Sequence, residues 1–414
     1  MSSASQFFAE RYSLTGLDNQ FTEEEQQFQA NIHRFAEQVV RPAGQQLDRM
    51  SAEQVLAADS PLWTVFQEYA QLGISPEFVN SLEPLQVARL MAILCEELGW
   101  GDAGLAVSLM SAGTCQRLAH NFENEFLLEN IPEDAISCWA ITEPDAGSDM
   151  VDFNDQIRHP AAGNRRRNCT ARIEGDEVII NGQKSAWVSN GTIAQYAALF
   201  CACERGNGPE NVALIVPLDL PGVSRGKPLE KMGQRPLPQG EVFFDNVRLS
   251  TDWLIAPVER YQEVAYVQLT EANAGMSLMF TGLARAAFEL ALDYVHERKQ
   301  GGVPIIRHQS VQSRLFHLFR KVEMSRALAR RNVEYTFSAM PPALIGSLAA
   351  KITGTQTAFE VASEALQLFG GNGLTLEYAI EKILRDARAS LIEDGCNEVL
   401  AIKGGALLQL PESA

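Results

Sequence analysis

The chain has 414 residues, of which 46% are hydrophobic and 21% charged, a composition typical of a globular protein large enough for more than one packed core. Its formal net charge of -18 argues against a nucleic-acid binder, which needs a basic face, although local arginines can still hold a phosphate group on an acidic protein. The sequence has no apolar run long enough to cross a membrane and no leader-like start, so we expect a cytoplasmic protein without a membrane partner.

The cysteines and histidines give no metal-binding pattern. The seven cysteines are irregularly spaced, which excludes a disulfide framework, and the six histidines show no HExxH or HxxxH spacing. Cys201 and Cys203 share one face of an expected strand, but no His/Cys pair lies near them in the sequence. We therefore predict buried thiols and no metal site.

Helical signals dominate residues 1–136. Thr22 and Glu25 have the spacing of a capping box, and the apolar residues behind them recur at helical spacing (Phe28, Ile32, Phe35, Val39). Residues 85–99 and 102–120 predict two further helices. The sequence thus predicts an α-helical N-terminal domain.

From residue 137 to residue 256 the pattern changes to a period of two, with Gly, Asn and Asp between the apolar segments. Residues 169–191 are typical of a hairpin series, in which Asn181-Gly182 is the expected turn. Further strands are expected over 194–203, 211–218 and 240–249. This part of the chain predicts a small barrel or sandwich.

After residue 257 the helical period returns and continues to the end of the chain. The expected helices are 262–299, 308–335, 342–369, 376–389 and 394–408, and the third of them stops at a run of glycines from residue 370. The layout is therefore α, then β, then α.

Five segments carry a resemblance to a known family. They are WAITEPDAGSD (139–149), NGQKSAWVSNG (181–191), KMGQRPLPQGEVFFDNVRL (231–249), ERKQGGVPIIRHQ (297–309) and QLFGGNGLTLEYAIEKILRDARASLIEDG (367–395). In order and spacing the chain resembles the acyl-CoA dehydrogenase family from about residue 22 to residue 408. The resemblance implies an α+β, FAD-dependent oxidoreductase with an α-helical N-terminal domain, a central β-barrel and a C-terminal four-helix bundle, over residues 1–136, 137–256 and 257–414.

The resemblance also implies the residues that hold FAD. Thr142 would meet the flavin through its backbone and hydroxyl, and the indole of Trp187 would stack against it while Ser189 donates a hydrogen bond. The other positions on the same copy of the chain that match flavin-site residues of the family are Trp139, Ile141, Gly147, Ser148, Cys396 and Glu398. Spacing between Lys184 and Trp187 is one residue longer than in the family, which indicates a bulge.

A second group of matching positions would reach the FAD of a neighbouring subunit. By resemblance Arg298 and Gln309 contact its pyrophosphate, because a planar guanidinium suits phosphate oxygens, and Gln367, Gly370 and Gly371 close over its adenosine. This implies a homodimer or homotetramer. Where the family often has Phe-Gly after this arginine, the chain has Gly301-Gly302.

The family's catalytic Glu-Gly falls on Asp394-Gly395, counted from Arg385-Asp386. Removal of an α-proton needs a carboxylate within hydrogen-bond reach, so Asp394 is our predicted base. Glu393 and Glu271 are the alternatives, because one is adjacent and the other lies one residue from the position, Ala272, where some family members carry the base.

The substrate is expected to be an acyl thioester of coenzyme A or of an acyl carrier protein, and an electron-transfer flavoprotein is the family's usual electron acceptor. Ser148, Thr270, Asn273 and Gly395 take the positions that face the substrate in the family. Thr270 and Asn273 depart from the usual Asp and Arg, which favours a branched, cyclic, aromatic or otherwise functionalised acyl group over a plain straight chain.

Two other functions stay open at the level of sequence. One is a flavin oxidase like the nitroalkane oxidases, which use an Asp at this place but also an Arg where this chain has Ala401. The other is a flavoprotein subunit that has lost its chemistry, because residues 270–273 and 394–398 are altered.

Overall fold

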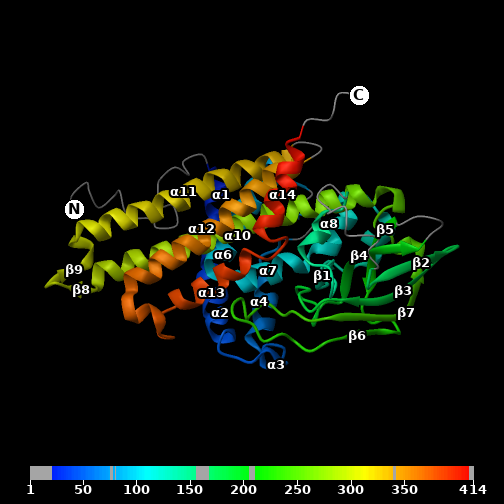
Figure 1. Cartoon of the computed structure of the whole chain (residues 1–414), viewed down its shortest axis with the longest axis horizontal. Helices are drawn as coiled ribbons and strands as arrows, with labels where there is room; N and C mark the ends of the chain where they lie inside the picture. The colour runs from blue at the N-terminus through cyan, green and yellow to red at the C-terminus, as the bar shows by residue number, and fades with distance from the viewer. Residues whose placement is uncertain are drawn as a thin grey trace.

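The structure is a computed structural model that describes residues 21–74, 78–79, 81–154, 167–204, 210–338 and 342–409. Helices form the first and last parts of the described residues, and a sheet lies between them in the sequence (Figure 1). The α, β, α order predicted from the sequence is therefore confirmed. None of the described helices is both long and apolar enough to span a membrane.

The N-terminal helices begin with the predicted capping box. Glu25 N donates to Thr22 Oγ1 at 3.2 Å, and Thr22 N donates to Glu25 Oε2 at 2.8 Å, so both ends of the box are closed. The helices are α1 (Glu23–Phe35), α2 (Arg41–Leu47), α3 (Ala52–Val55), α4 (Pro61–Ala70), α6 (Pro84–Gly101), α7 (Ala103–Ala112), α8 (Thr114–Asn121) and α9 (Glu125–Asn130).

The middle strands form one seven-stranded sheet in the order β1-β4-β2-β3-β7-β6, with β5 paired to β4. One apolar core contains residues from both the β4–β5 pair and the β3–β7 pair, so the sheet wraps around a shared interior. Pairings among the described strands leave an open path, without the closing pair of a complete barrel. The strands are β1 (Ser137–Ala140), β2 (Thr170–Glu174), β3 (Glu177–Lys184), β4 (Tyr196–Glu204), β5 (Glu210–Pro217), β6 (Val223–Arg225) and β7 (Val242–Ser250).

The predicted turn at Asn181-Gly182 is wrong, because both residues lie inside β3. Gly182 has φ 119° and marks a shift of register between β3 and β7, and a Cβ there would lie 1.8 Å from Asn168 O. The chain reverses instead at Gly175, between β2 and β3, where φ is 60°. A glycine can be required by a β-bulge or by a close backbone neighbour as well as by a hairpin turn, and the sequence looks the same in each case.

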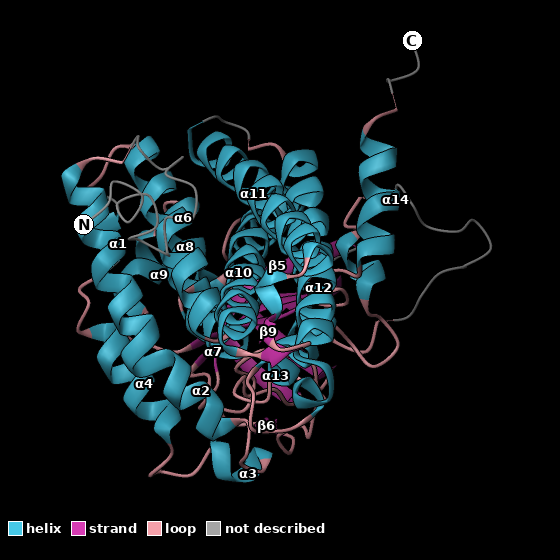
Figure 2. Ribbon diagram, turned by 90° about the vertical axis from the view of Figure 1, so that its left-hand side faces the viewer, coloured by secondary structure: helices cyan, strands magenta, loops and turns pink. Residues whose placement is uncertain are grey.

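Three long helices of the C-terminal part run side by side (Figure 1, Figure 2). They are α10 (Tyr261–Glu297), α11 (Gln309–Ser338) and α12 (Leu344–Phe369), followed by α13 (Ile380–Ser390) and α14 (Asn397–Leu407), with a two-stranded ribbon of β8 (Lys299–Gln300) and β9 (Val303–Pro304) between α10 and α11. One apolar core joins α6 and α7 to α10, α11, α12 and α13.

Glycine and buried charge fix how α6 crosses α10. A Cβ on Gly282 would lie 1.9 Å from Glu96 O, so the two backbones touch at this point. Beside the crossing, Arg285 donates to Glu96 at 2.8 Å, and Arg326 of α11 donates to the same carboxylate at 2.7 Å. Because these groups are buried and paired with one another, they set the position of three helices that line the site described next.

Candidate functional site

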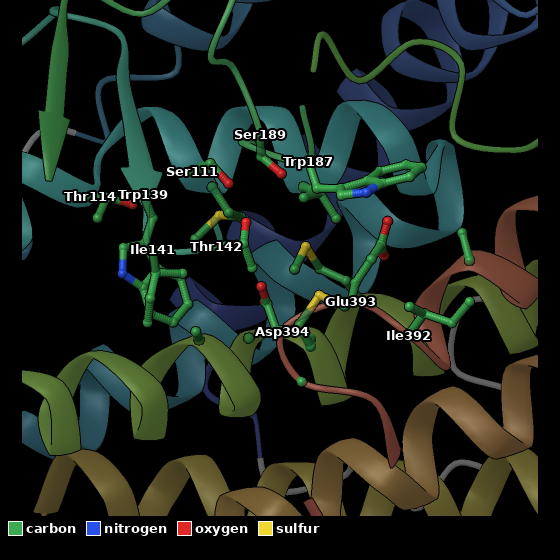
Figure 3. A pocket seen from close by; sticks show the side chains of 18 of the residues that line it. Ser111, Thr114, Trp139, Ile141, Thr142, Trp187, Ser189, Ile392, Glu393 and Asp394 are labelled. Carbon is green, nitrogen blue, oxygen red and sulfur yellow. The ribbon is translucent and has the colours of Figure 1, made fainter. Parts of the chain in front are cut away.

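A cavity of about 740 Å³ lies where the strand ends of the middle part meet the helices on both sides of it. Its walls come from α6, α7, α8, α10, α11 and α13 and from the loops around residues 141–151, 187–189, 230–239 and 392–395. Figure 3 shows Trp187 and Ile392 at one end of the labelled set, Thr114 and Trp139 at the other, and Asp394 between them. Segments distant in sequence therefore build one cavity.

The strand side of the cavity presents aromatic and hydroxyl groups. Trp139 belongs to β1, and Ile141 and Thr142 follow directly where that strand ends. The carbonyl of Thr142 accepts from Ser185 N at 2.9 Å, and its hydroxyl accepts from Ser185 Oγ at 2.9 Å. These bonds tie the end of β1 to the end of β3 and hold the Thr142 hydroxyl in place.

Beneath this wall, a buried ion pair fixes the loop after β1. Lys184 Nζ donates to Glu143 Oε1 at 2.7 Å and also to the carbonyls of Ile141 and Phe200. Both side chains are buried, and the amine has three acceptors. The motif containing Thr142 is therefore anchored from within the sheet, as a rigid site requires.

Trp187 lies in a turn after β3, where the sequence predicted a strand. Its carbonyl accepts from Gln239 Nε2 at 3.1 Å, and Ser189 Oγ accepts from the same amide at 3.4 Å. The indole is 63% exposed and lines the cavity. Since large aromatic side chains are usually covered, this ring offers a flat apolar surface to a ligand.

Asp394 stands on the loop between α13 and α14, in a backbone conformation that is uncommon for residues other than glycine. Its φ is 50° and that of Gly395 is 92°, so two successive residues are left-handed. A Cβ on Gly395 would lie 2.7 Å from Leu400 Cδ2, so both the positive φ and the lack of space favour glycine at this position. In Figure 3 the Asp394 carboxylate points toward the Thr142 side of the cavity.

The two neighbouring acids on this loop differ in their partners. Burial raises the pKa of Asp394, and the positive charge of Lys351 opposes that rise. Burial also raises the pKa of Glu393 to about 7, although Gln234 Nε2 donates to its carboxylate at 2.7 Å. Both line the cavity, so the site holds two carboxyl groups whose pKa values are raised by burial.

Glu271, the other alternative base, lines the cavity from α10. Burial raises its pKa, opposed by the charge of Arg117 and by a hydrogen bond at 2.8 Å from Asn121 Nδ2. Arg117 lines the same region and donates to Thr114 Oγ1 at 3.2 Å. Glu271 is thus engaged with α8, whereas Asp394 and Glu393 belong to the loop before α14.

The residues of α10 that line the cavity lie on one broad side of the helix; they are Gln268, Glu271, Ala272, Ala274, Gly275, Met276, Leu278 and Met279. Thr270 and Asn273, for which the sequence suggested substrate contact, are buried on other faces and do not line the cavity. Thr270 Oγ1 donates to Tyr266 O at 2.7 Å, and Asn273 Nδ2 donates to Leu269 O at 2.9 Å. The structure therefore gives no support to direct contact between either residue and the substrate.

Gly147, Ser148 and Gly395 do line the cavity, but Cys396 and Glu398 do not. Cys396 N donates to Ser148 Oγ at 2.9 Å, which links the loop before α14 to the motif after β1. Glu398, in the first turn of α14, is exposed. In this copy of the chain these two residues lie behind the cavity wall.

The predicted pyrophosphate and adenosine residues gather elsewhere. Arg298 directly follows α10, Gln309 begins α11, and Gln367, Gly370 and Gly371 lie at the end of α12; none of them lines the cavity. The ends of α10 and α12 are adjacent, because Tyr294 stacks on Phe369 with ring centroids 4.0 Å apart. Figure 1 shows β8 and β9, next to Arg298, at the end of the long helices away from the sheet.

Several residues at the site escaped the sequence analysis. Lys351 of α12 lies beneath the Asp394 loop, and Lys231, inside the third family-like motif, donates to Gln239 Oε1 at 2.8 Å. Burial lowers the pKa of both lysines to about 8. Lys231 could have been found from its motif, but Lys351 lies in a plain helical segment, and only the fold brings it to the site.

Comparisons with known proteins agree with this architecture. Family models described as acyl-CoA dehydrogenase, middle domain, and acyl-CoA dehydrogenase, C-terminal domain, match residues 138–247 and 263–405. A probable acyl-CoA dehydrogenase of Bacillus subtilis, YngJ, is 26% identical over 396 residues, which span 92% of this chain and 97% of that protein. The mitochondrial isobutyryl-CoA dehydrogenase of Dictyostelium discoideum is 27% identical over 92% of this chain and 88% of its own length.

Solved structures show the same fold. Butyryl-CoA dehydrogenase from Megasphaera elsdenii superposes with a TM-score of 0.82 at 24% identity, over 94% of this chain and 99% of that one. The prolyl acyl carrier protein oxidase AnaB gives a TM-score of 0.79 at 23% identity, over 94% of this chain and 100% of that one. The two family models together cover more than half of the chain, which therefore belongs to the acyl-CoA dehydrogenase family of FAD-dependent enzymes.

Proposed function

We propose that this enzyme forms an α,β-double bond in an acyl thioester whose acyl group is branched, cyclic or otherwise functionalised, with Asp394 as the base. The observation that carries the proposal is the position of Asp394: its carboxylate lies inside the cavity, between the exposed Trp187 end and the Trp139 end. Burial raises its pKa, and a stronger base suits a weak carbon acid.

The residues around the cavity fit FAD. The bare indole of Trp187 suits stacking against a planar ring, and the hydroxyls of Thr142 and Ser189 reach the same cavity. Trp139 Nε1 is buried and has no hydrogen-bond partner in the described chain. A bound ligand with an acceptor atom would satisfy this donor. When bound, FAD supplies the acceptor for the hydrogen that leaves Cβ as hydride.

Asp394 takes the α-proton onto its carboxylate, and the backbone N–H of the same residue would donate to the thioester oxygen, as the family resemblance implies. Such a donor stabilises the negative charge that develops on this oxygen as the proton leaves. The left-handed backbone at residues 394 and 395 points the carboxylate into the cavity, and Ser148 ties the loop to the wall after β1. Apolar walls from α6, α10 and α11 exclude water from the acyl group.

Both apolar and polar groups line the part of the cavity available to a substrate. The apolar wall includes Met91, Cys95, Met276, Met279, Val333 and Phe337, and its methionines can adapt to acyl groups of different shape. Gln268 is 3% exposed, and its Oε1 has no partner in the described chain. This mixture supports a functionalised acyl group, on either coenzyme A or a carrier protein.

The remote cluster of Arg298, Gln309, Gln367, Gly370 and Gly371 supports FAD binding across two copies of the chain. Arg298 follows α10, Gln309 begins α11, the other three lie at the end of α12, and none of the five lines the cavity of its own copy. A homodimer or homotetramer in which each copy completes its neighbour's FAD site accounts for this separation. An electron-transfer flavoprotein is the proposed electron acceptor.

The proposed function is tested by anaerobic titration of the FAD-loaded enzyme with a panel of straight, branched, cyclic and aminoacyl thioesters on coenzyme A and on pantetheine carriers. We expect at least one functionalised thioester to bleach the flavin and to yield the α,β-unsaturated product. Bleaching or peroxide formation with nitroalkanes alone would instead identify an oxidase. A flavin that no thioester reduces would indicate a subunit that has lost its chemistry.

A further inference from the structure

Lys351 differs from the other buried lysines of the described chain. Lys184, Lys382 and Lys403 each bind a carboxylate: Glu143 at 2.7 Å, Asp102 and Asp386 at 2.5 Å, and Asp152 at 3.1 Å. Lys351, fully buried, forms no ion pair with any described residue. A buried ammonium without a contacting carboxylate is costly, so its position calls for a reason.

The Lys351 amine is bound to the loop that carries the predicted base. Its Nζ donates to Gly395 O at 2.8 Å and to Asn397 Oδ1 at 2.8 Å. Asn397 Nδ2 in turn donates to Thr355 Oγ1, one turn further along α12, at 3.0 Å. The left-handed pair 394–395 is thereby fastened to α12 on one side and, through Cys396 N and Ser148 Oγ, to the middle part on the other.

The charges around Lys351 are those of the active-site loop. It faces Asp394 and Glu393 on that loop, and Cys396 and Glu398 at the start of α14. The positive charge of Lys351 opposes the rise that burial causes in the pKa of Asp394. Two other charged side chains, Arg388 of α13 and Glu271 of α10, line the same cavity. Lys351 is thus the cation of α12 that acts on the carboxylate without touching the substrate cavity.

We propose that Lys351 is the positioning residue of the base: it holds the 394–395 turn in its left-handed form and supplies the positive charge that keeps the Asp394 carboxylate ionised. The inference rests on the proposed function for its kinetic consequences, but the electrostatic part can be measured on the resting protein. Without the amine, the turn loses an anchor and the Asp394 carboxylate loses its compensating charge.

The two roles can be separated by substitution. Lys351→Met removes both the hydrogen bonds and the charge, whereas Lys351→Gln removes the charge but keeps an amide N–H donor, on a shorter side chain, for the 394–395 turn. In both variants the pKa of Asp394 rises, because burial is then unopposed, so the acidic limb of kcat/KM moves to higher pH by about one unit. Only in Lys351→Met do we expect kcat at the plateau to fall as well, roughly 10- to 100-fold, through misplacement of the carboxylate.

Lys403→Met is the matched control, since it removes an equally buried lysine that pairs with Asp152 and makes no contact with the 394–395 turn. We expect it to lower thermal stability without moving the acidic limb. Flavin absorbance and circular dichroism of each variant check that FAD is bound and that the chain is folded. If Lys351→Met does not fold, Lys351→Gln still carries the test of the charge.

A direct titration makes the proposal independent of turnover. In protein labelled with ¹³C-aspartate, the Asp394 carboxyl signal is assigned by its loss in Asp394→Asn and followed from acidic to neutral pH. An upward shift of its midpoint in Lys351→Gln supports the proposal, even in a protein that no tested thioester reduces, where the proposed function alone fails. An unchanged midpoint together with an unchanged acidic limb would overturn it.

Discussion

Asp394, Glu393 and Glu271 line the same cavity, and their surroundings separate their roles. Asp394 faces the charge of Lys351, Glu393 accepts a hydrogen bond from Gln234, and Glu271 is bound to Asn121. We expect Glu393→Gln and Glu271→Gln to keep anaerobic flavin reduction within a few fold, because loss of a general base costs roughly 10²–10⁴-fold and the proposed mechanism gives that role to neither acid.

The pH dependence gives a second, signed prediction for Glu393, whose pKa is raised by burial to about 7. As the pH rises through this value the group becomes charged and disfavours ionisation of Asp394 beside it. Glu393→Gln should therefore shift the acidic limb of kcat/KM slightly to lower pH. A loss of activity comparable to removal of a base would transfer the catalytic role from Asp394 to Glu393.

At the same scale, Asp394, the base predicted from the family resemblance, lines the cavity, whereas two of the predicted substrate residues do not. Asp394 follows from its spacing to Arg385-Asp386, because loop residues between two short helices keep their count. Thr270 and Asn273 were expected at the substrate because of family positions, yet the cavity-lining face of α10 excludes them. The helix α10 has 37 residues and is buried along most of its length. Its packing partners determine which of its faces meets the cavity, and the sequence alone does not identify these partners.

Among the secondary-structure elements, the junction of α6, α10 and α11 is held by charge. Coulombic attraction to Arg326, Arg330 and Arg285 outweighs burial and lowers the pKa of Glu96. A lowered pKa means that the stabilisation is present above the ordinary pKa of a glutamate and is lost as the pH falls through the lowered value. The three helices should therefore separate on strong acidification.

Glu96→Gln leaves Arg285, Arg326 and Arg330 without their shared carboxylate, and we expect it to lower the free energy of unfolding by about 3–5 kcal/mol at neutral pH. The deficit should shrink as the pH falls, because the wild-type glutamate then loses its charge too. Urea unfolding at several pH values, followed by circular dichroism, measures both effects. A loss below about 1 kcal/mol at neutral pH would show that the network is not what holds the junction.

The elements that the sequence predicted well have local causes. The expected helices 262–299, 308–335 and 342–369 agree closely with α10, α11 and α12, because apolar periodicity and the glycines after Phe369 act within a few residues. The misplaced turn at Asn181-Gly182 and the strand expected around Trp187 have non-local causes. At Gly182 the backbone of Asn168 lies so close that only a glycine fits, although the chain does not turn there. Before Trp187 the strand ends because Ser185 forms a hydrogen bond with Thr142, about forty residues earlier in the sequence.

For the whole molecule, the separation between the cavity and the cluster around Arg298 predicts subunit complementation. Arg298→Ala should weaken FAD binding, and Asp394→Asn should abolish turnover with FAD bound. If each FAD site combines two copies, a mixed dimer of these variants contains one site with both Asp394 and Arg298 intact. The two variants are co-expressed with different tags, and purification through both tags selects the mixed dimers. We expect these dimers to show up to about half of the wild-type activity, because one of their two sites is intact.

Recovered activity has no explanation in a protein whose FAD site lies within one chain. The control is each variant purified alone and mixed without exchange of subunits, which should stay inactive. Absence of recovery in a verified mixed dimer would contradict an FAD site shared between copies. The sequence suggests this arrangement only through the family resemblance, because no local pattern shows that Arg298 and Asp394 of one chain belong to two different FAD sites.

The central claim concerns the carboxylate of Asp394, and the most direct measurement is the rate of anaerobic flavin reduction by the preferred acyl thioester in Asp394→Asn and in the wild type, both loaded with FAD. The amide keeps the size of the side chain but cannot take the α-proton, so we predict a fall on the order of 10³-fold with unchanged FAD content. Reduction at the wild-type rate in this variant would contradict the mechanism.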